Sequence, residues 1–347
     1  MLSKRIYGAV LLTVLFAYFL YSCNPKMGGV VIQPPQLSDK KGSLNEGERI
    51  AEGLERLSAS VYRVTVIAFY DVYTLSGDVP VYRDQLSQMK LKRTAIAHDV
   101  IHRTVLGTAI PVYYDENTAG FLTCAHVVTF PDTAVSYYDT NVNSSGKKAI
   151  KSIAVKLRQQ NYISDLLGEN VTVVAIDRDH DIAFLKMNIK PDDPHPVLFP
   201  FLPGNSASLN WGEKLYILGF PQGKKMVTSA LYSKPVSSKF AFFLMDAVLN
   251  RGFSGAPVVV YNNQPPYFKW VGMASSIASQ DMTYLVPDFS EQATYNTSEL
   301  YQGPIKVNKA KMISYGISYS LSMEQIRRFV QENKEALAQN GIGPIDW

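Results

Sequence analysis

The stretch VLNRGFSGAPVVV, Val248 to Val260, joins a turn to an apolar run. Its Arg-Gly-Phe-Ser-Gly segment favours a tight backbone bend. The β-branched residues that follow favour a buried strand. Ser254 is therefore either a nucleophile held on a rigid bend or a simple turn residue. The choice depends on whether a base and an acid occur elsewhere in the chain.

The composition is that of a folded protein without an obvious nucleic-acid surface. Of the 347 residues, 46% are hydrophobic and 18% are charged, which is ample for one large or two ordinary domains. The net charge is +4, but basic and acidic residues are interspersed, so we expect no nucleic-acid partner. Cys23 and Cys124 have no metal-ligand spacing, and we expect neither a metal nor another cofactor.

The N-terminus resembles a bacterial lipoprotein signal. Lys4 and Arg5 precede an apolar run over residues 6–20, and the run ends at LYSC, with Ser22 directly before Cys23. This predicts a signal peptide over residues 1–22 and a lipid on Cys23. An uncleaved membrane anchor is the alternative, and either would place the rest of the chain outside the cytoplasm.

A flexible tether is expected over residues 23–42, which are rich in Pro, Gly, Ser and Lys. From Val61 onward, short runs of Val, Ile, Tyr and Phe recur too often for alternating strands and helices, which predicts an antiparallel barrel or sandwich. Amphipathic helices are expected at its two ends, over residues 44–57 and 322–339. Long surface loops or insertions are expected at 75–101, 138–148 and 280–312.

A base and an acid do occur. His126 follows a strand-like run in GFLTCAHVV. In AIDRDHDIAFLKM, Asp181 alone leads directly into an apolar strand, while Asp177 and Asp179 read as a solvated turn and His180 as their exposed neighbour. A buried carboxylate there could accept a hydrogen bond from the imidazole and fix its tautomer.

The order His126, Asp181, Ser254 resembles that of the chymotrypsin-like serine proteases, and the chain is most similar to their HtrA-type branch. The similarity extends to LGFPQG (218–223), DAVLNRGFSGAPVV, KWVGMASSI and YGISYSLSMEQI, and covers about 61–330. It implies an all-β fold, a chymotrypsin-like double six-stranded antiparallel β-barrel with a short N-terminal and a C-terminal helix. The protease domain would span 43–335, with a tail at 336–347 and no PDZ domain.

The resemblance also implies residue roles. Ser254 would attack a peptide carbonyl, His126 would take its proton, and Asp181 would orient His126. The backbone N–H groups of Gly252 and Ser254 would form the oxyanion hole. The substrate pocket would have Val248 at its base and Ala274, Ser275 and Ser276 along its wall. This lining predicts a preference for small or medium apolar P1 residues.

Two residues depart from the family pattern. Phe253 replaces a small or polar residue, and Ala256 replaces a glycine. Phe253 could pack on a neighbouring loop or partly cover the cleft, Ala256 adds one methyl group, and either residue could tilt the oxyanion hole into an inactive arrangement.

The sequence thus predicts a membrane-anchored extracytoplasmic serine endopeptidase of the cell envelope, facing the periplasm or the cell surface, with a protein or peptide substrate. A catalytically silent protein that binds a peptide or protein partner through the same fold is the alternative. An esterase with the same triad fits the barrel pattern less well.

Overall fold

The computed structural model describes residues 44–347 except 143–145, 165, 167–170, 191, 235–240, 288–297, 299, 301–302, 304 and 346. The expected signal peptide, Cys23 and the tether lie outside these residues. Within the described part of the chain, no helix is long and apolar enough to cross a membrane.

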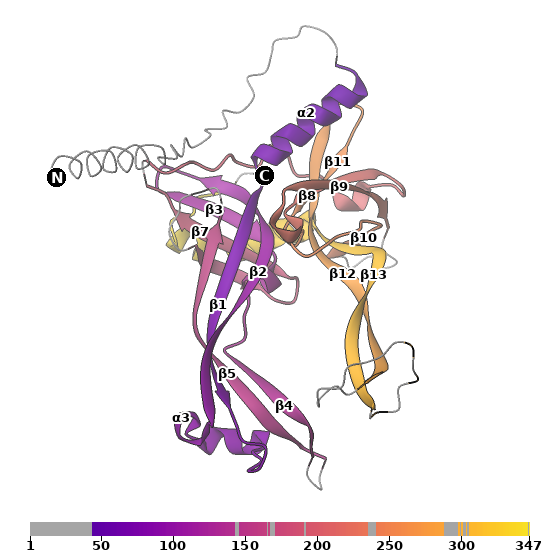
Figure 1. Cartoon of the computed structure of the whole chain (residues 1–347). Helices are drawn as coiled ribbons and strands as arrows, with labels where there is room; N and C mark the ends of the chain where they lie inside the picture. Colours follow the sequence, from indigo (N-terminus) through magenta and orange to yellow (C-terminus); the bar gives the residue numbers. More distant parts are fainter. Residues whose placement is uncertain are drawn as a thin grey trace, which may run out of the picture. The chain divides into compact units, whose positions relative to one another are not determined.

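The first sheet is antiparallel and has the strand order β4-β5-β1-β2-β3-β7-β6 (Figure 1). Its strands are β1 (Tyr62–Thr74), β2 (Ala97–Tyr114), β3 (Thr118–Thr123), β4 (Thr133–Val142), β5 (Lys148–Ile163), β6 (Thr172–Asp177) and β7 (Ile182–Asn188). The sheet curls until β5 meets the residue before β6. There, Val171 N–H donates to the Asn161 carbonyl at 3.1 Å, and Asn161 Nδ2 donates to the Val171 carbonyl at 2.9 Å. Six strands thus form the expected first barrel, and β4 is an additional strand on β5.

The second sheet is a closed barrel with the order β10-β13-β12-β11-β8-β9. Its strands are β8 (Lys214–Gly219), β9 (Met226–Ser233), β10 (Phe242–Met245), β11 (Pro257–Tyr261), β12 (Phe268–Pro287) and β13 (Ile305–Ser322). Alternate residues of these strands point inward, among them Ile217, Phe243 and Val258, and form one buried cluster. The predicted double barrel is therefore present.

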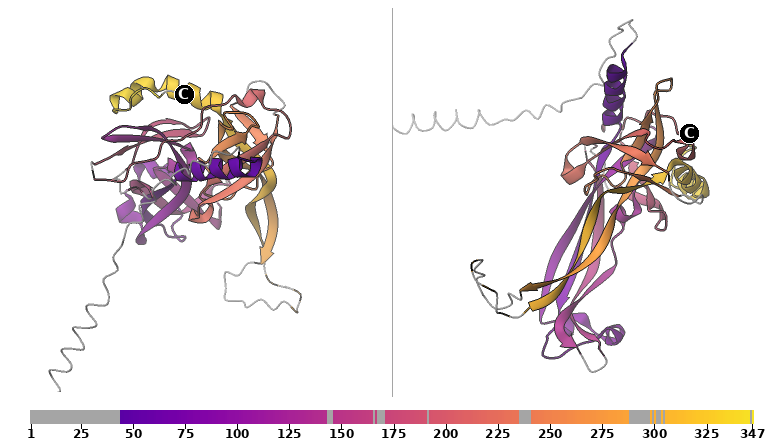
Figure 2. Two further views of the ribbon diagram at one scale, coloured as in Figure 1. Left: turned by 90° about the horizontal axis from the view of Figure 1, so that it is seen from above. Right: turned by 90° about the vertical axis from the view of Figure 1, so that its right-hand side faces the viewer.

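Helices are found at both ends of the domain, as expected (Figure 2). Helix α2 (Glu46–Ala59) begins with a capping box in which Asn45 and Glu48 exchange hydrogen bonds. At the other end, α5 (Met323–Glu332) and α6 (Lys334–Gln339) replace the single expected helix. Leu337 is buried, so the C-terminal residues belong to the folded domain and not to a separate tail.

Short helical segments occur in the connections. They are η1 (Arg83–Gln88), α3 (Leu91–Thr94), α4 (Ala125–Val128), η2 (Ser206–Ser208) and η3 (Pro221–Gly223).

Among the described residues, two of the three expected insertions, 138–148 and 280–312, are formed mainly by strands and not by loops. The third, 75–101, contains η1 and α3 and has strand only over 97–101. Strands β1, β2, β4 and β5 continue well past the first barrel, and β12 and β13 leave the second barrel as a long hairpin (Figure 1). Residues 96–104 are exposed throughout. Because both faces of such strands contact water, their sequences lack the alternation of a half-buried strand and resemble loops.

The far end of the first sheet has a small core of its own. Leu75, Ile150 and Ile153 are buried there, and Leu86 and Leu91 pack over them. This core fixes the segment 75–101 as a folded cap on the extended strands.

Candidate active site

Ser254 lies on a backbone turn that requires glycine. Gly252 has φ +113° and Gly255 has φ +89°, conformations that residues with a Cβ rarely adopt. A Cβ on Gly255 would lie 2.1 Å from the carbonyl oxygen of Thr108, so the turn also approaches β2 too closely for any side chain. The quoted Arg-Gly-Phe-Ser-Gly segment therefore forms the bend that its composition predicts.

Thr108 of β2 fastens this turn to the first barrel. Its N–H donates to the Ser254 carbonyl at 2.8 Å, and its Oγ1 donates to the Gly252 carbonyl at 2.7 Å. Thr108 is not among the site residues predicted from the sequence. Its signal was the Gly107-Thr108 pair, which precedes the strand that leads toward His126.

His126 lies in α4, directly after β3 and Cys124. Its Nδ1 is 2.8 Å from Asp181 Oδ2 and its Nε2 is 2.8 Å from Ser254 Oγ. Its backbone N–H donates to Asp181 Oδ1 at 2.9 Å. The structure thus brings the three predicted catalytic residues into one hydrogen-bonded chain.

Asp181 comes from the turn between β6 and β7. Asp177 holds this turn, because its Oδ1 accepts hydrogen bonds from the N–H groups of Asp179 and His180. The His180 ring pairs with Asp177 at 2.6 Å, so it is engaged away from Ser254. Asp181 has φ 56°, a conformation that Asp tolerates, and leads into the buried Ile182.

Ser275 has a different position from the one expected. Its Oγ donates to Asp181 Oδ2 at 2.5 Å, and its carbonyl accepts a hydrogen bond from Ser254 Oγ at 3.4 Å. Its side chain therefore supports the carboxylate and does not line a pocket wall. Sequence spacing could not reveal this contact, because strand β12 brings Ser275 to Asp181 from the other barrel.

Of the other three expected pocket residues, one is buried and two are exposed. Ala274 is fully buried, and its N–H and carbonyl bond to Ala256 and Gly255, so it offers no surface to a substrate. Val248 is 53% exposed and Ser276 is exposed. The candidates for contact with a P1 side chain are thus reduced to Val248 and Ser276.

The backbone of the expected oxyanion hole is held by a neighbouring turn. Gln222 N–H donates to the Arg251 carbonyl at 3.0 Å. Since the peptide bond that follows Arg251 is trans, the N–H of Gly252 points away from Gln222. This fixed orientation leaves the Gly252 N–H directed away from the supporting turn, as an oxyanion donor must be.

The two departures from the family pattern lie in the core. Phe253 is 1% exposed and packs inside the second barrel, together with the fully buried Ala256. Phe253 therefore does not cover the cleft. Its ring instead anchors the turn that carries Ser254.

The electrostatics favour an ionised acid beneath the histidine. Burial by itself raises the pKa of Asp181, but the hydrogen bond and charge of His126 and the hydroxyl of Ser275 outweigh it, so the net pKa is lowered. Asp181 is therefore ionised at neutral pH and can stabilise an imidazolium.

Cys124, His126 and Asp181 place their ligand atoms within 4.8 Å of one another, a spacing that suits a metal ion. Both ring nitrogens of His126 are already within hydrogen-bond distance of Asp181 and Ser254. Burial, followed by the charge of Asp181, raises the pKa of the Cys124 thiol well above its usual value, whereas a metal ligand must be a thiolate. The cluster is better explained by the triad and a buried thiol.

Gly252→Ala is expected to lower kcat/KM for a peptide about 10²- to 10³-fold, as loss of one oxyanion donor does. The new Cβ would lie 2.1 Å from the Phe220 carbonyl oxygen, so the turn must move and carry the N–H with it. Steady-state kinetics test this. Gly212→Ala is the control: it also has positive φ (+79°), but its Cβ would meet nothing within 4 Å. Equal losses in both variants would contradict a specific role for Gly252.

Comparisons with known proteins found one family model and several solved structures. Residues 107–265 match the family model of the trypsin-like peptidase domain. Among solved structures, the chain is similar to the HtrA-type protease AlgW with a tripeptide, with 16% identity, TM-score 0.39 and coverage of 84% of this chain and 64% of that one. An alanine-substituted form of AlgW with a decapeptide gives 16% identity, TM-score 0.40 and coverage of 84% and 67%. The chain thus spans about two thirds of the length of these proteins. No curated protein sequence matches it.

Proposed function

We propose that the chain is a serine endopeptidase, a reading supported by the match of residues 107–265 to the trypsin-like peptidase domain. The observation that carries this proposal is the unbroken hydrogen-bonded chain from Asp181 through both ring nitrogens of His126 to Ser254 Oγ. The peptidase match spans all three residues.

In the proposed mechanism, Ser254 Oγ attacks the carbonyl carbon of a peptide bond while His126 Nε2 takes its proton. Asp181 stabilises the imidazolium, and the N–H groups of Gly252 and Ser254 stabilise the oxyanion. The tetrahedral intermediate collapses when His126 protonates the leaving amine, which leaves an acyl group on Ser254. Water, deprotonated by His126, then hydrolyses this ester.

The test is fluorophosphonate labelling together with casein cleavage by the purified protein. Labelling and cleavage that are both lost in Ser254→Ala would support the proposal. Labelling without cleavage would indicate an active triad behind a restricted cleft. A well-folded protein that does neither would favour the alternative, a protease-fold protein that binds a peptide or protein partner.

For specificity, we propose small or medium apolar P1 residues. Val248 and Ser276 offer no carboxylate to pair with a Lys or Arg side chain, and Val248 presents an exposed apolar surface. A fluorogenic peptide panel should show the highest kcat/KM for Ala, Val or Leu at P1. In Val248→Asp, cleavage after Arg should rise relative to cleavage after Leu. Preferred cleavage after Arg by the unaltered protein would contradict this assignment.

For location, we propose that a lipid on Cys23 anchors the domain to a membrane of the cell envelope, on its extracytoplasmic side. The basic residues, the apolar run and Ser22-Cys23 support this proposal. In a bacterial host, metabolic labelling with a fatty acid should mark the protein, and Cys23→Ser should abolish the label. Cys124→Ser is the control and should keep it. A label that persists in Cys23→Ser would contradict lipidation at this residue.

A further inference from the structure

Strand β2 has a long unpaired edge. It pairs with β1 from Ala97 to Ala109, whereas β3 covers its other side only from Ile110 to Tyr114. Among the described residues, no strand pairs with the other side of β2 over 97–107. Residues 96–104 are all exposed. An uncovered edge of this length presents a row of backbone donors and acceptors that an extended chain can pair with.

The backbone groups that face this open edge can be identified from the register. The N–H of Thr108 donates to Ser254, so it points away from β1. The β1–β2 register is unbroken, and the direction of the backbone groups alternates along a strand. Four even-numbered residues in the exposed segment therefore also direct their N–H and C=O groups outward: His98, Val100, His102 and Thr104.

An independent contact supports the assignment of outward backbone groups to the even-numbered residues of β2. Leu75 N–H donates to the Lys151 carbonyl, so odd-numbered residues of β1 face β5. Even-numbered residues of β1 must then face β2, where their partners are odd-numbered, such as Thr74 with Ala97. The even-numbered residues of β2 are thus left with outward backbone groups.

The open edge is continuous with the nucleophile. Thr108, at its end, is hydrogen-bonded to Ser254 itself. With increasing residue number β2 runs toward Ser254, whereas the part of a substrate that follows the cleaved bond runs away from it. The two directions are opposite, which is the arrangement of an antiparallel strand pair.

From these observations, and resting on the proposed peptidase activity, we propose that the edge of β2 from Leu106 back to His98 is a binding site for the primed side of the substrate. The segment C-terminal to the cleaved bond adds to the sheet as an antiparallel strand. Because Ser254 occupies the Thr108 N–H, the next outward-facing residue of β2 is Leu106, and we place P2′ opposite it. At a rise of about 3.3 Å per residue, the edge from Leu106 to His98 is roughly 27 Å long and takes about eight substrate residues beyond P2′.

The chemistry of the edge defines the substrate class. Recognition by backbone groups tolerates many sequences but requires an extended chain. Several side chains along the edge are already engaged with β1: His98 pairs with Asp71 at 3.1 Å, and His102 lies against the ring of Phe69. The expected substrates are therefore unfolded polypeptides, or proteins with an unstructured segment of about ten residues after the cleavage site.

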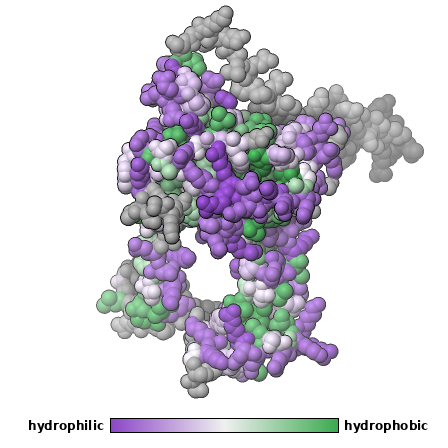
Figure 3. All heavy atoms as spheres, turned by 180° about the vertical axis from the view of Figure 1, so that it is seen from behind, coloured by the Kyte–Doolittle hydropathy of each residue, from purple (hydrophilic) through white to green (hydrophobic). Residues whose placement is uncertain are grey.

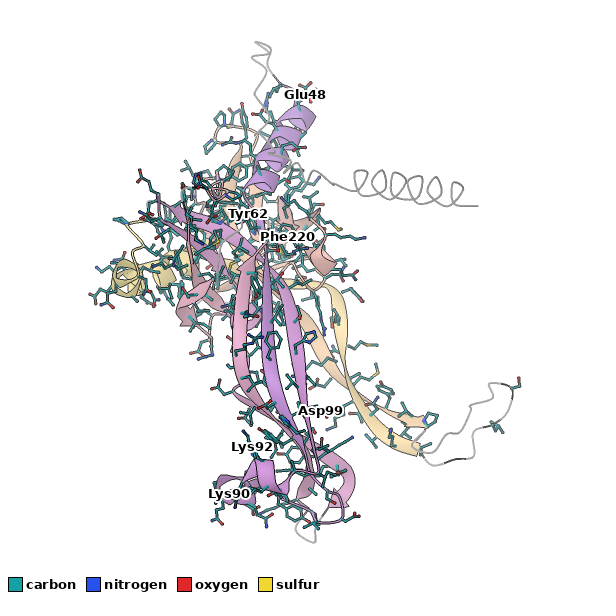
Figure 4. The ribbon with its side chains drawn as sticks, turned by 60° about the vertical axis from the view of Figure 1, so that its left-hand side comes forward. Glu48, Tyr62, Lys90, Lys92, Asp99 and Phe220 are labelled. Carbon is teal, nitrogen blue, oxygen red and sulfur yellow. The ribbon has the colours of Figure 1, made fainter. Side chains whose placement is uncertain are left out.

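The figures show room for such a strand. The space-filling view has an opening between the extended part of the first sheet and the β12–β13 hairpin (Figure 3). Asp99, in β2, lies at the border of the sheet that faces this opening (Figure 4).

The first test uses the full chain and two quenched fluorescent peptides built around a casein cleavage site mapped by mass spectrometry. Both contain six residues before the cleaved bond, followed by either three or ten residues. The longer peptide is expected to have at least about tenfold higher kcat/KM, because several backbone hydrogen bonds are added. Equal values for the two peptides, with normal fluorophosphonate labelling, would overturn this inference and leave the peptidase proposal standing. A protein that neither labels nor cleaves would overturn both.

Backbone N-methylation of the longer peptide gives a sharper test. Removing the N–H at P4′ or P6′, which would face Thr104 or His102, should remove most of its advantage. The same methyl group at P5′ or P7′, whose N–H would face away from β2, should have a smaller effect. Losses without this alternation would overturn the strand pairing.

Thr104→Pro tests the edge from the protein side. Proline removes an outward N–H without removing a β1–β2 hydrogen bond. The ratio of the kcat/KM values of the long and short peptides should fall toward one, whereas Thr104→Ala, which retains the N–H, should preserve the ratio. A different result would overturn the substrate assignment: the ratio of the kcat/KM values stays the same in Thr104→Pro, but a concentration-dependent dimer of the unaltered protein is lost. In that case the edge of β2 would bind a second copy of the chain.

Discussion

Replacing Ser254 with alanine is expected to lower kcat/KM for a casein-derived peptide by about 10⁶-fold, the loss typical of a nucleophile that acts together with its base. Ser254 Oγ is 2.8 Å from His126 Nε2, and among the described residues no other hydroxyl is hydrogen-bonded to the His126 ring. The residual rate should come from substrate binding and the oxyanion hole.

The control is Ser208→Ala, which removes an exposed hydroxyl in η2, outside the triad. It should leave kcat/KM unchanged, and the thermal midpoints of both variants should match that of the unaltered protein. His126→Ala added to Ser254→Ala should cost little more, because the two residues act as one unit. Cleavage that survives in Ser254→Ala would refute the assigned nucleophile.

Asp181→Asn is expected to lower kcat about 10⁴-fold, because an amide stabilises the wrong tautomer of His126 and cannot stabilise its charged form. Asp181 Oδ2 accepts hydrogen bonds from both the His126 ring and the Ser275 hydroxyl. In Asp181→Asn, an amide nitrogen at the position of Oδ2 would place its N–H groups against the ring N–H of His126 and the hydroxyl of Ser275, which are themselves donors. Fluorophosphonate labelling should slow in parallel with peptide cleavage.

The chain contains a matched control for this variant. Asp177 pairs with His180 at 2.6 Å, much as Asp181 pairs with His126, but the pair is not connected to Ser254. Asp177→Asn should therefore change kcat less than twofold. If Asp177→Asn and Asp181→Asn reduced kcat equally, loss of the β6–β7 turn and not loss of the catalytic carboxylate would be the cause.

Asp181 also links the site to the stability of the fold. Burial raises its pKa, but its hydrogen bonds and the His126 charge lower it more, so the folded-state pKa is below the unfolded value. The stabilisation is therefore present above about pH 4, the pKa of an unfolded Asp, and is lost as pH falls through the lowered pKa.

Local chemistry made much of this site predictable. Positive φ at Gly252 and Gly255 is a property of glycine, so the bend at Ser254 can be read from five residues. The apolar run after Asp181 indicates that this acid, among three, precedes a buried strand. The expected triad residues are found together in the structure, and the double barrel follows from the short, repeated strand signals.

Other features depend on contacts between distant segments. Ser275 and Gln222 each support the site through a partner on another element, and their sequence neighbours do not distinguish them from ordinary strand or turn residues. The burial of Ala274 likewise results from packing behind the Ser254 turn, and so the expected pocket wall was partly wrong.

By itself, the sequence determined the bend that carries Ser254, the order of the triad and the all-β class, because these depend on backbone preferences and on the alternation of apolar residues. Tertiary structure alone decided that the insertions at 138–148 and 280–312 contain paired strands, that Ser275 binds Asp181, and that no described strand covers the edge of β2 that leads to Ser254. The physical reason is that strand partners and edges are set by the register between segments far apart in the chain, and an exposed strand has no apolar pattern to reveal that register.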